Sequence, residues 1–342
     1  MRMNKRVELP LVEPVYKTYQ NQGTATAIIA DNPTIRNWYL NQIMNLTCWR
    51  RFLTGWTTPA LTIVDSSWTM NPYLESVQKI STKYTKGYIN PIIREMLDNG
   101  LYVAFDKVDD YYIKGKSMYK ERHFGHDGLI CGYDRDEKTY CMYAYDSSWV
   151  YRKFWISQKD FNAGRRAMMK QGIYTNIYGL RVKENVVEFS PAVACNNIAE
   201  YLDSDLEKYP FDGQGRIFGI VVQEYIAEYV SKLFNGEIPY ERMDWRIFSL
   251  IWEHKKVMLE RIIMLEQSLG MDNDISEKYK PLVAEADMMR MLYASHHMKR
   301  RDSVLQTIRS KLLLLMEKER ELLTTLVVRA GKEIKNETME IS

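Results

Sequence analysis

The spacing of apolar residues changes near residue 190, and this change constrains the fold more than any other feature of the chain. Between residues 101 and 180, short stretches alternate in the way expected of strands with one buried face, as at Leu101, Val103 and Phe105. After residue 190 the apolar residues recur every three or four positions, which is typical of amphipathic helices. The pattern predicts an α+β domain with an antiparallel sheet, followed by an all-α helical bundle.

The elements of both domains can be placed from local signals. In an N-terminal domain of residues 1–185, we expect an extended arm to about residue 30, a helix over 33–52 and a second helix that ends at Gly100. Strands are predicted over 128–133 and 139–145, joined by a charged turn, and over 151–156 and 173–180. In a helical domain of residues 190–330 we predict helices over 192–202, 217–234, 242–269, 275–295 and 300–330, and then a polar, frayed tail over 331–342.

Charge and hydropathy limit the partners and the compartment. The net charge of +3 comes from 47 basic and 44 acidic residues that are spread along the chain, which argues against nucleic acid as an obligatory partner. No apolar stretch is long enough for a membrane helix, and the first residues do not form a secretory signal. The four cysteines form no CxxC pair, so free thiols in a reducing compartment are expected. We therefore expect a cytoplasmic protein that forms homo-oligomers, if any, through its C-terminal helices.

One histidine and one aspartate are predicted to face each other across the hairpin over 128–145. If the turn is centred near residue 136, His126 and Asp146 fall at opposed positions, where Cβ atoms are about 4.5–5.5 Å apart. A carboxylate that bonds an imidazole holds the ring in one tautomer and makes it a better base. The alternative is a histidine at a strand end whose ring is satisfied locally. A register shift of one residue would separate the two side chains.

Three other groups of polar residues have simple structural interpretations. His123 and His126 have no nearby third ligand, so no metal site is predicted, and no cofactor is expected. Asp109 and Asp110 are expected in a solvated turn. The loop with Lys114, Lys116, Lys120 and Arg122 is expected to be an ordinary charged loop, although it could meet the phosphate of a phosphopantetheine arm or an acidic carrier protein.

The same segment carries a resemblance to a known family. The runs H-D-G-L-I-C-G-Y-D (126–134) and Y-A-Y-D (143–146), preceded by G-L-Y-V-A-F-D-K-V-D-D-Y-Y (100–112), resemble the N-terminal domain of butirosin biosynthesis protein H and its relatives in antibiotic gene clusters. These proteins are similar to papain-like proteins of the bacteriocin-leader-peptidase type. The similarity covers roughly residues 35–180. It implies transfer of an acyl group from a carrier-protein thioester to an amine by cysteine, histidine and aspartate, with His126 and Asp146 in the last two roles.

The nucleophile is where this sequence departs from the family pattern. In papain-like folds the cysteine lies at the N-terminus of the first long helix, where the helix dipole and a histidine lower its pKa. The corresponding residues around 31–34 include no cysteine. Three alternatives remain: Cys48 is the nucleophile, the hydroxyl of Thr34 replaces it, or the domain has lost its chemistry. Cys131, Cys141 and Cys195 are expected to be small buried residues.

Two classes of function follow from these alternatives. One is an acyltransferase-like protein of specialised-metabolite biosynthesis, in which Cys48 attacks a thioester, His126 takes the thiol proton and Asp146 orients the ring. The other is an inactive papain-like protein that binds a carrier protein or a peptide, with the helices as a scaffold. A cysteine peptidase is a third and weaker alternative. A thiol within reach of His126 would distinguish an enzyme from a binding protein.

Overall fold

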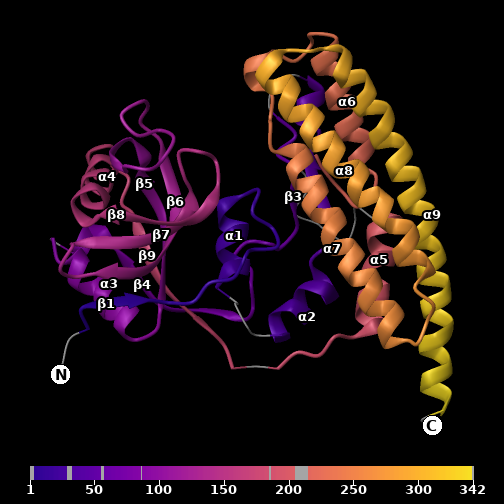
Figure 1. Cartoon of the computed structure of the whole chain (residues 1–342), viewed down its shortest axis with the longest axis horizontal. Coiled ribbons are helices and arrows are strands. Elements are labelled where there is room, and N and C mark those ends of the chain that lie inside the picture. Colours follow the sequence, from indigo (N-terminus) through magenta and orange to yellow (C-terminus); the bar gives the residue numbers. More distant parts are fainter. Residues whose placement is uncertain are drawn as a thin grey trace. The chain divides into compact units, whose positions relative to one another are not determined.

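A computed structural model describes residues 4–28, 33–54, 58–85, 87–184, 186–204 and 215–340 (Figure 1). The chain divides into two compact units. The first unit comprises Met1–Asn32 and Ser66–Asn185, and the second comprises Pro33–Asp65 and Val186–Ser342. The chain passes between the units three times, and only the last crossing, after residue 185, lies near the boundary predicted from sequence. The segment Pro33–Asp65, which was assigned from sequence to the N-terminal domain, belongs to the second unit.

The first unit is built on an antiparallel sheet with the strand order β4-β9-β5-β6-β7-β8, and β1 pairs with β6. The bounds of its strands are β1 Arg6–Glu8, β4 Leu74–Ser81, β5 Tyr102–Asp109, β6 Gly125–Asp134, β7 Thr139–Tyr145, β8 Tyr151–Ser157 and β9 Asn176–Val182. Every predicted strand of this region is present. β4, whose residues are mostly exposed, was not predicted.

Both faces of this sheet are covered. Helices α3 (Ile89–Asp98) and α4 (Gln158–Lys170) supply Ile93, Met96 and Phe161 to one apolar cluster with residues of β5, β6 and β7. Helix α1 (Gln20–Ala27) supplies Ala25 and Ala27 to a second cluster with other residues of the same strands. Alternate residues of each strand therefore face α3 and α4 or face α1.

The predicted register of the β6–β7 hairpin is confirmed over its open end. Leu129 lies opposite Tyr143, and Ile130 lies opposite Met142, as a turn centred near residue 136 requires. A bulge between Ile130 and Gly132 then shifts the pairing by one residue towards the turn. The other local signals near this sheet are also confirmed. Gly100 has a left-handed φ of +74° after α3, and the Ser157 hydroxyl accepts the Asp160 amide at the start of α4.

The predicted helix over 33–52 is wrong beyond its first half. Helix α2 (Pro33–Gln42) ends before β2 (Leu46–Trp49), and a 3-10 helix follows at Arg50–Thr54. β2 pairs with β3 (Thr62–Ile63) and with β10 (Arg216–Phe218), so long-range pairing overrides the helical spacing of Leu46 and Trp49. β10 also occupies the start of the helix predicted over 217–234.

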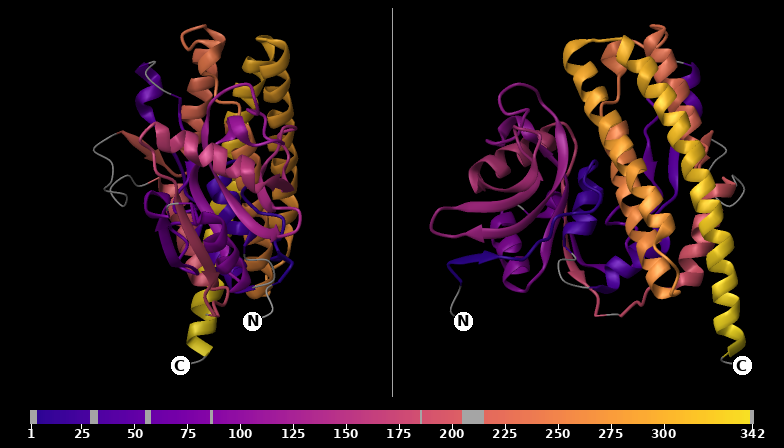
Figure 2. Two further views of the ribbon diagram at one scale, coloured as in Figure 1. Left: turned by 90° about the vertical axis from the view of Figure 1, so that its left-hand side faces the viewer. Right: turned by 45° about the vertical axis from the view of Figure 1, so that its right-hand side comes forward.

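Helices make up the rest of the second unit. Their bounds are α5 Pro191–Asp203, α6 Val222–Phe234, α7 Ile247–Ser268, α8 Asp274–Lys299 and α9 Ser303–Glu340. Helix α9 packs against α5, α6 and α8, and α7 packs against α8. The predicted frayed tail is wrong, because α9 continues to Glu340 and its end extends past the neighbouring helices (Figure 2).

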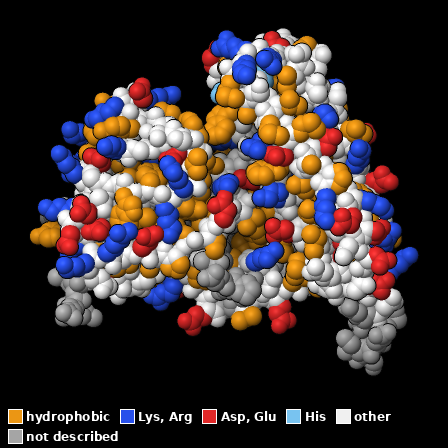
Figure 3. Space-filling view, viewed as in Figure 1, with side chains coloured by type: hydrophobic (Ala, Val, Ile, Leu, Met, Phe, Trp, Pro, Cys, Tyr) orange, Lys and Arg blue, Asp and Glu red, His pale blue; other side chains and the backbone are white. Residues whose placement is uncertain are grey.

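Two observations bear on the predictions from charge and hydropathy. Within the described residues, no helix is both long and apolar enough to cross a membrane. On the face shown in Figure 3, basic and acidic side chains are interspersed rather than gathered by sign. The second observation agrees with the near-balance of charges in the sequence.

Candidate functional site

Two adjacent aspartates at the end of β5 organise the polar site of the first unit. Asp109 is fully buried, and its carboxylate accepts the amides of Tyr111 (3.2 Å) and Phe124 (3.0 Å). Its second oxygen lies 2.7 Å from Nδ1 of the exposed His123, whose ring stacks on Tyr111. Asp109 therefore fixes the chain directly before β6. The prediction that Asp109 and Asp110 form a solvated turn is wrong.

His126 lies between two carboxylates at the start of β6. Its Nδ1 is 3.4 Å from Oδ2 of Asp110, and its Nε2 is 3.5 Å from Oδ1 of Asp127. The side chain is 30% exposed, and the ring of Phe124, which is itself 46% exposed, lies 5.2 Å away. One side of the imidazole is therefore open to a ligand, while both ring nitrogens have carboxylate partners within the unit.

A buried lysine supplies the positive charge of this cluster. Lys116 Nζ lies 3.5 Å from Oδ2 of Asp110, and its side chain is 2% exposed. Burial lowers the pKa of Lys116, and the charges of Asp110, Asp127 and Asp146 act in the opposite direction. Partial burial raises the pKa of Asp127, and the charge of His126 opposes that change. The prediction that Lys116 belongs to an ordinary charged loop is therefore wrong.

The first residue of α1 reaches the same cluster. The side-chain amide of Gln20 donates to the backbone carbonyl of Asp127 and lies 3.5 Å from its Oδ1, the same oxygen that His126 Nε2 approaches. Its Oε1 accepts the amide of Tyr145 at 3.2 Å, so Gln20 bridges β6 and β7. The side chain is 4% exposed. Gln20 and His126 thus meet at one carboxylate oxygen, with the helix N-terminus behind Gln20.

The carboxylate of Asp146 does not pair with the imidazole of His126 as predicted. Its Oδ1 accepts the amides of Ser148 (2.8 Å) and Val150 (3.0 Å), and its Oδ2 accepts Nε of Arg152. Burial alone would raise its pKa, but the hydrogen bonds from Val150, Ser148 and Arg152 outweigh burial and lower the pKa. The hairpin ladder stops at Tyr145, and the chain turns away at Asp146. The carboxylate beside Nδ1 of His126 is therefore that of Asp110 and not, as predicted from sequence, that of Asp146.

Cys48 has the surroundings of a structural thiol. It lies in β2 of the second unit opposite Ile217, whereas His126 belongs to the first unit. Its side chain is 1% exposed, and burial raises the pKa of the thiol to about 12. Cys131, Cys141 and Cys195 are buried as predicted, and none of the four cysteines forms a disulfide. Of the other nucleophile positions, residues 31 and 32 and the side chain of Thr34 lie outside the described parts of the chain.

The described residues contain no cluster of three or more potential metal ligands. No family model matches the chain, and no curated protein matches it. The interpretation of the site therefore depends on the geometry above and on the sequence resemblance.

Sequence reasoning identified His126 but missed Asp110, Lys116, Asp127 and Gln20 as members of the cluster. For Asp110 and Lys116 a signal was present, because both lie in the loop between two predicted strands that end at the same edge of the sheet. For Gln20 there was little signal. Helix α1 reads Q-N-Q-G-T-A-T-A, and seven of its eight residues are buried, so it shows no amphipathic pattern.

Proposed function

We propose that this chain is a non-catalytic, papain-like protein of the butirosin-biosynthesis-H type that binds a carrier protein or a peptide. The main support for the proposal is that the side-chain amide of Gln20 and Nε2 of His126 both lie close to Oδ1 of Asp127. In a papain-like fold the nucleophile stands at the N-terminus of the helix that packs on the histidine strand, and here α1 is such a helix. Its first residue carries an amide, which cannot attack a thioester.

The contacts of the His126 ring support ligand binding more than proton transfer. A histidine that activates a thiol needs one ring nitrogen directed at that thiol. The His126 nitrogens instead approach Asp110 and Asp127, and Cys48 is buried in the second unit with a raised pKa. The exposed ring of Phe124 and the part-exposed His126 and Asp127 offer an apolar surface and hydrogen-bonding groups to a ligand chain.

The test combines a binding measurement with a turnover measurement. Ring resonances of the five histidines would be followed while holo carrier proteins from the source organism, or peptides, are added. We expect one partner to shift the His126 ring and to bind more weakly to Phe124→Ala and His126→Ala, while Trp155→Ala, an exposed aromatic residue elsewhere, binds normally. We also expect no turnover of acyl thioesters or peptides.

Two results would overturn the proposal. Turnover that Cys48→Ala abolishes would establish the acyltransferase or peptidase alternative. Binding that leaves the His126 ring unperturbed would place the ligand elsewhere on the molecule.

A further inference from the structure

Three tyrosine rings of the first unit converge on one ammonium group. Nζ of Lys120 lies 5.1 Å from the ring centroid of Tyr111 and 5.6 Å from that of Tyr112. The ring centroid of Tyr119 lies 5.7 Å from the same atom. The rings of Tyr111 and Tyr112 are 5.1 Å apart with an interplanar angle of 75°, so they form two nearly perpendicular walls. The three rings together form an aromatic cage, an arrangement that binds organic cations in proteins.

Buried polar groups hold this cage in place. The carboxylate of Asp109 accepts the amide of Tyr111 at 3.2 Å, and its other oxygen lies 2.7 Å from Nδ1 of His123. The ring of His123 stacks on that of Tyr111 at 4.3 Å. The amide of Tyr119 donates to the carbonyl of the buried Lys116 at 3.1 Å. The three tyrosines are half-buried, so the cage is held by the fold and still offers accessible surface to a ligand.

Lys120 is a poorly matched occupant of the cage. The residue is exposed, and among residues 87–184 and the other described parts of the chain no carboxylate pairs with its ammonium. Its backbone has a left-handed φ of +60°, and its amide donates to the carbonyl of Tyr111 at 3.1 Å. A lysine ammonium is strongly hydrated and has three N–H donors, for which the faces of the rings are poor acceptors. A cation without N–H groups therefore loses less hydration on entering the cage and can displace Lys120.

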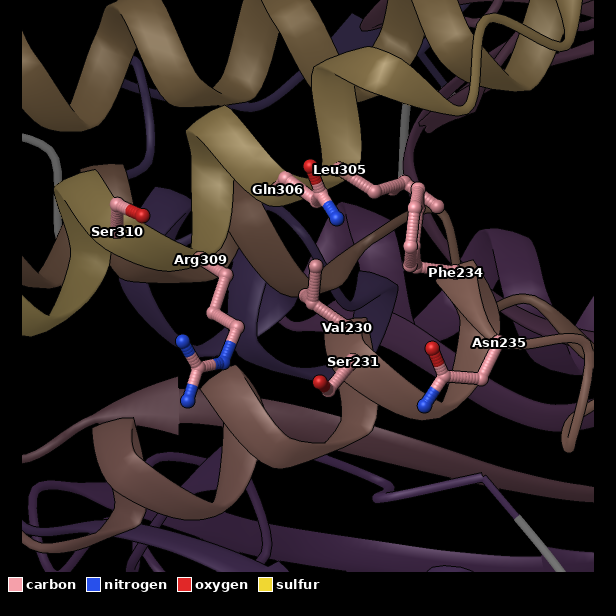
Figure 4. A pocket seen from close by; sticks show the side chains of 8 residues that line it. All are labelled: Val230, Ser231, Phe234, Asn235, Leu305, Gln306, Arg309 and Ser310. Carbon is pink, nitrogen blue, oxygen red and sulfur yellow. The ribbon is translucent and has the colours of Figure 1, made fainter.

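The pocket between α6 and α9 in the second unit has no such arrangement (Figure 4). Val230 and Leu305 are 0% and 1% exposed, so they offer no surface to a ligand. Phe234 is the one aromatic residue in the lining of this pocket, and Arg309 is the one charged residue. The tyrosine cage therefore offers a ligand more defined contacts than this pocket does.

We propose that Tyr111, Tyr112 and Tyr119 bind a small quaternary ammonium compound, which displaces the ammonium of Lys120 from the cage. A trimethylammonium group is weakly hydrated, and its methyl groups cover the faces of the rings and leave water. The positive charge distinguishes this ligand from a neutral compound of the same shape, and the methyl groups distinguish it from a primary amine. The inference does not rest on the function proposed for the His126 cluster.

Choline is the probe, added to the full-length protein at constant ionic strength. Saturation-transfer NMR and the ring resonances of His123, which stacks on Tyr111, follow its binding. A ligand of this size is expected to bind with a Kd on the order of 1 mM. Ethanolamine, the primary-amine analogue, and dimethylbutanol, in which carbon replaces the nitrogen of choline, should each bind at least about tenfold more weakly.

Variants separate the effect of Lys120 from that of the rings. Lys120→Gly removes the competing ammonium, and glycine suits the left-handed backbone there, so choline should bind roughly twofold to fivefold more tightly. Tyr119→Leu should weaken binding about threefold to tenfold, whereas Tyr119→Phe keeps the ring and should bind normally. Tyr84→Leu, which alters an exposed tyrosine beside Lys83, is the control and should also bind normally.

Four results would overturn the proposal. One is the absence of choline binding by both wild type and Lys120→Gly. Another is equal binding of dimethylbutanol, which would show that the positive charge is not recognised. Unchanged binding by Tyr119→Leu would place choline elsewhere on the molecule. An affinity of Lys120→Gly no higher than that of wild type would show that Lys120 does not occupy the binding site.

Discussion

Lys116 Nζ lies 3.5 Å from Oδ2 of Asp110, and the two side chains are 2% and 5% exposed. A buried charge without a partner is far more costly than a buried pair, so each residue depends on the other. The same Asp110 oxygen lies 3.4 Å from His126 Nδ1. Asp110 therefore links the stability of the first unit to the orientation of the His126 ring, which is 30% exposed.

Replacing Asp110 with asparagine should destabilise the protein by about 3–5 kcal/mol, because Lys116 would remain buried and charged without its carboxylate. Chemical denaturation at pH 7 measures the change. Asp136→Asn is the matched control, since that side chain is 66% exposed, and it should cost less than about 0.5 kcal/mol.

The pair can also be removed as a whole. Asp110→Leu combined with Lys116→Met should recover much of the stability lost in Asp110→Asn, because no buried charge is left. A cost for Asp110→Asn that is no larger than the cost for Asp136→Asn would contradict the buried pair.

Asp146→Asn should destabilise the protein in a pH-dependent way. The folded pKa of Asp146 lies below its unfolded value of about 3.9, so its charge stabilises the fold above about pH 4. That stability is lost as the pH falls through the folded pKa. The difference between wild type and Asp146→Asn, measured by urea denaturation, should be about 1–3 kcal/mol at pH 7 and should shrink towards zero below pH 4. A difference in unfolding free energy that does not change with pH would show that the charge of Asp146 does not stabilise the fold.

All four cysteines should react slowly with a thiol reagent in the native protein. Each is buried, which keeps the reagent from the sulfur, and burial also raises the pKa of Cys48 to about 12, so little Cys48 thiolate forms at pH 8. Labelling with a chromogenic disulfide measures the rates, and unfolding in guanidinium should release all four thiols as the control. One thiol that is labelled within seconds under native conditions would revive the thiol-dependent mechanism if mass mapping assigned it to Cys48.

Glu319→Gln should destabilise the helical unit by about 3–5 kcal/mol. The carboxylate is fully buried and lies 2.6 Å from Lys255 Nζ, and it also accepts the hydroxyl of Tyr279 and the amide of Gln223. Burial lowers the pKa of Lys255, and Glu319 is the group that opposes this effect. Thermal and urea denaturation measure the change. Glu321→Gln, two residues away on the exposed side of α9, should be nearly neutral.

The strands of the first unit could be predicted because local signals and tertiary packing agree there. Alternation and the charged turn set the β6–β7 register, and Gly100 and Ser157 marked two helix ends. The prediction failed where local sequence signals and tertiary packing disagree. Leu46 and Trp49 have helical spacing but lie in a strand that is held by residues about 170 positions later in the chain.

The candidate site was harder to predict than the fold, because it depends on the ends of strands. Regular alternation would have directed His126 at residue 146, but a bulge between Phe105 and Val108 and the turn at Asp146 change the directions of side chains there. Neither irregularity has a sequence signature. Which carboxylate meets His126 is therefore a property of the folded chain.

Gln20→Cys tests the proposed relationship to papain-like proteins directly. If the start of α1 is the former nucleophile position, a thiol there should have a pKa below the ordinary value of about 8.5, because the helix dipole and His126 favour the thiolate. The ultraviolet absorbance of the thiolate, followed against pH as the difference between the variant and wild type, measures this pKa without requiring a reagent to reach a position that is 4% exposed. Ser148→Cys, in the turn after Asp146, is the control and should titrate near 8.5. Adding His126→Ala to Gln20→Cys should raise the thiol pKa by about one unit if the imidazole contributes. A Gln20→Cys thiol whose pKa is raised instead would show that burial and the nearby Asp127 carboxylate outweigh the helix dipole and His126 at this position, and it would argue against α1 as the former nucleophile helix.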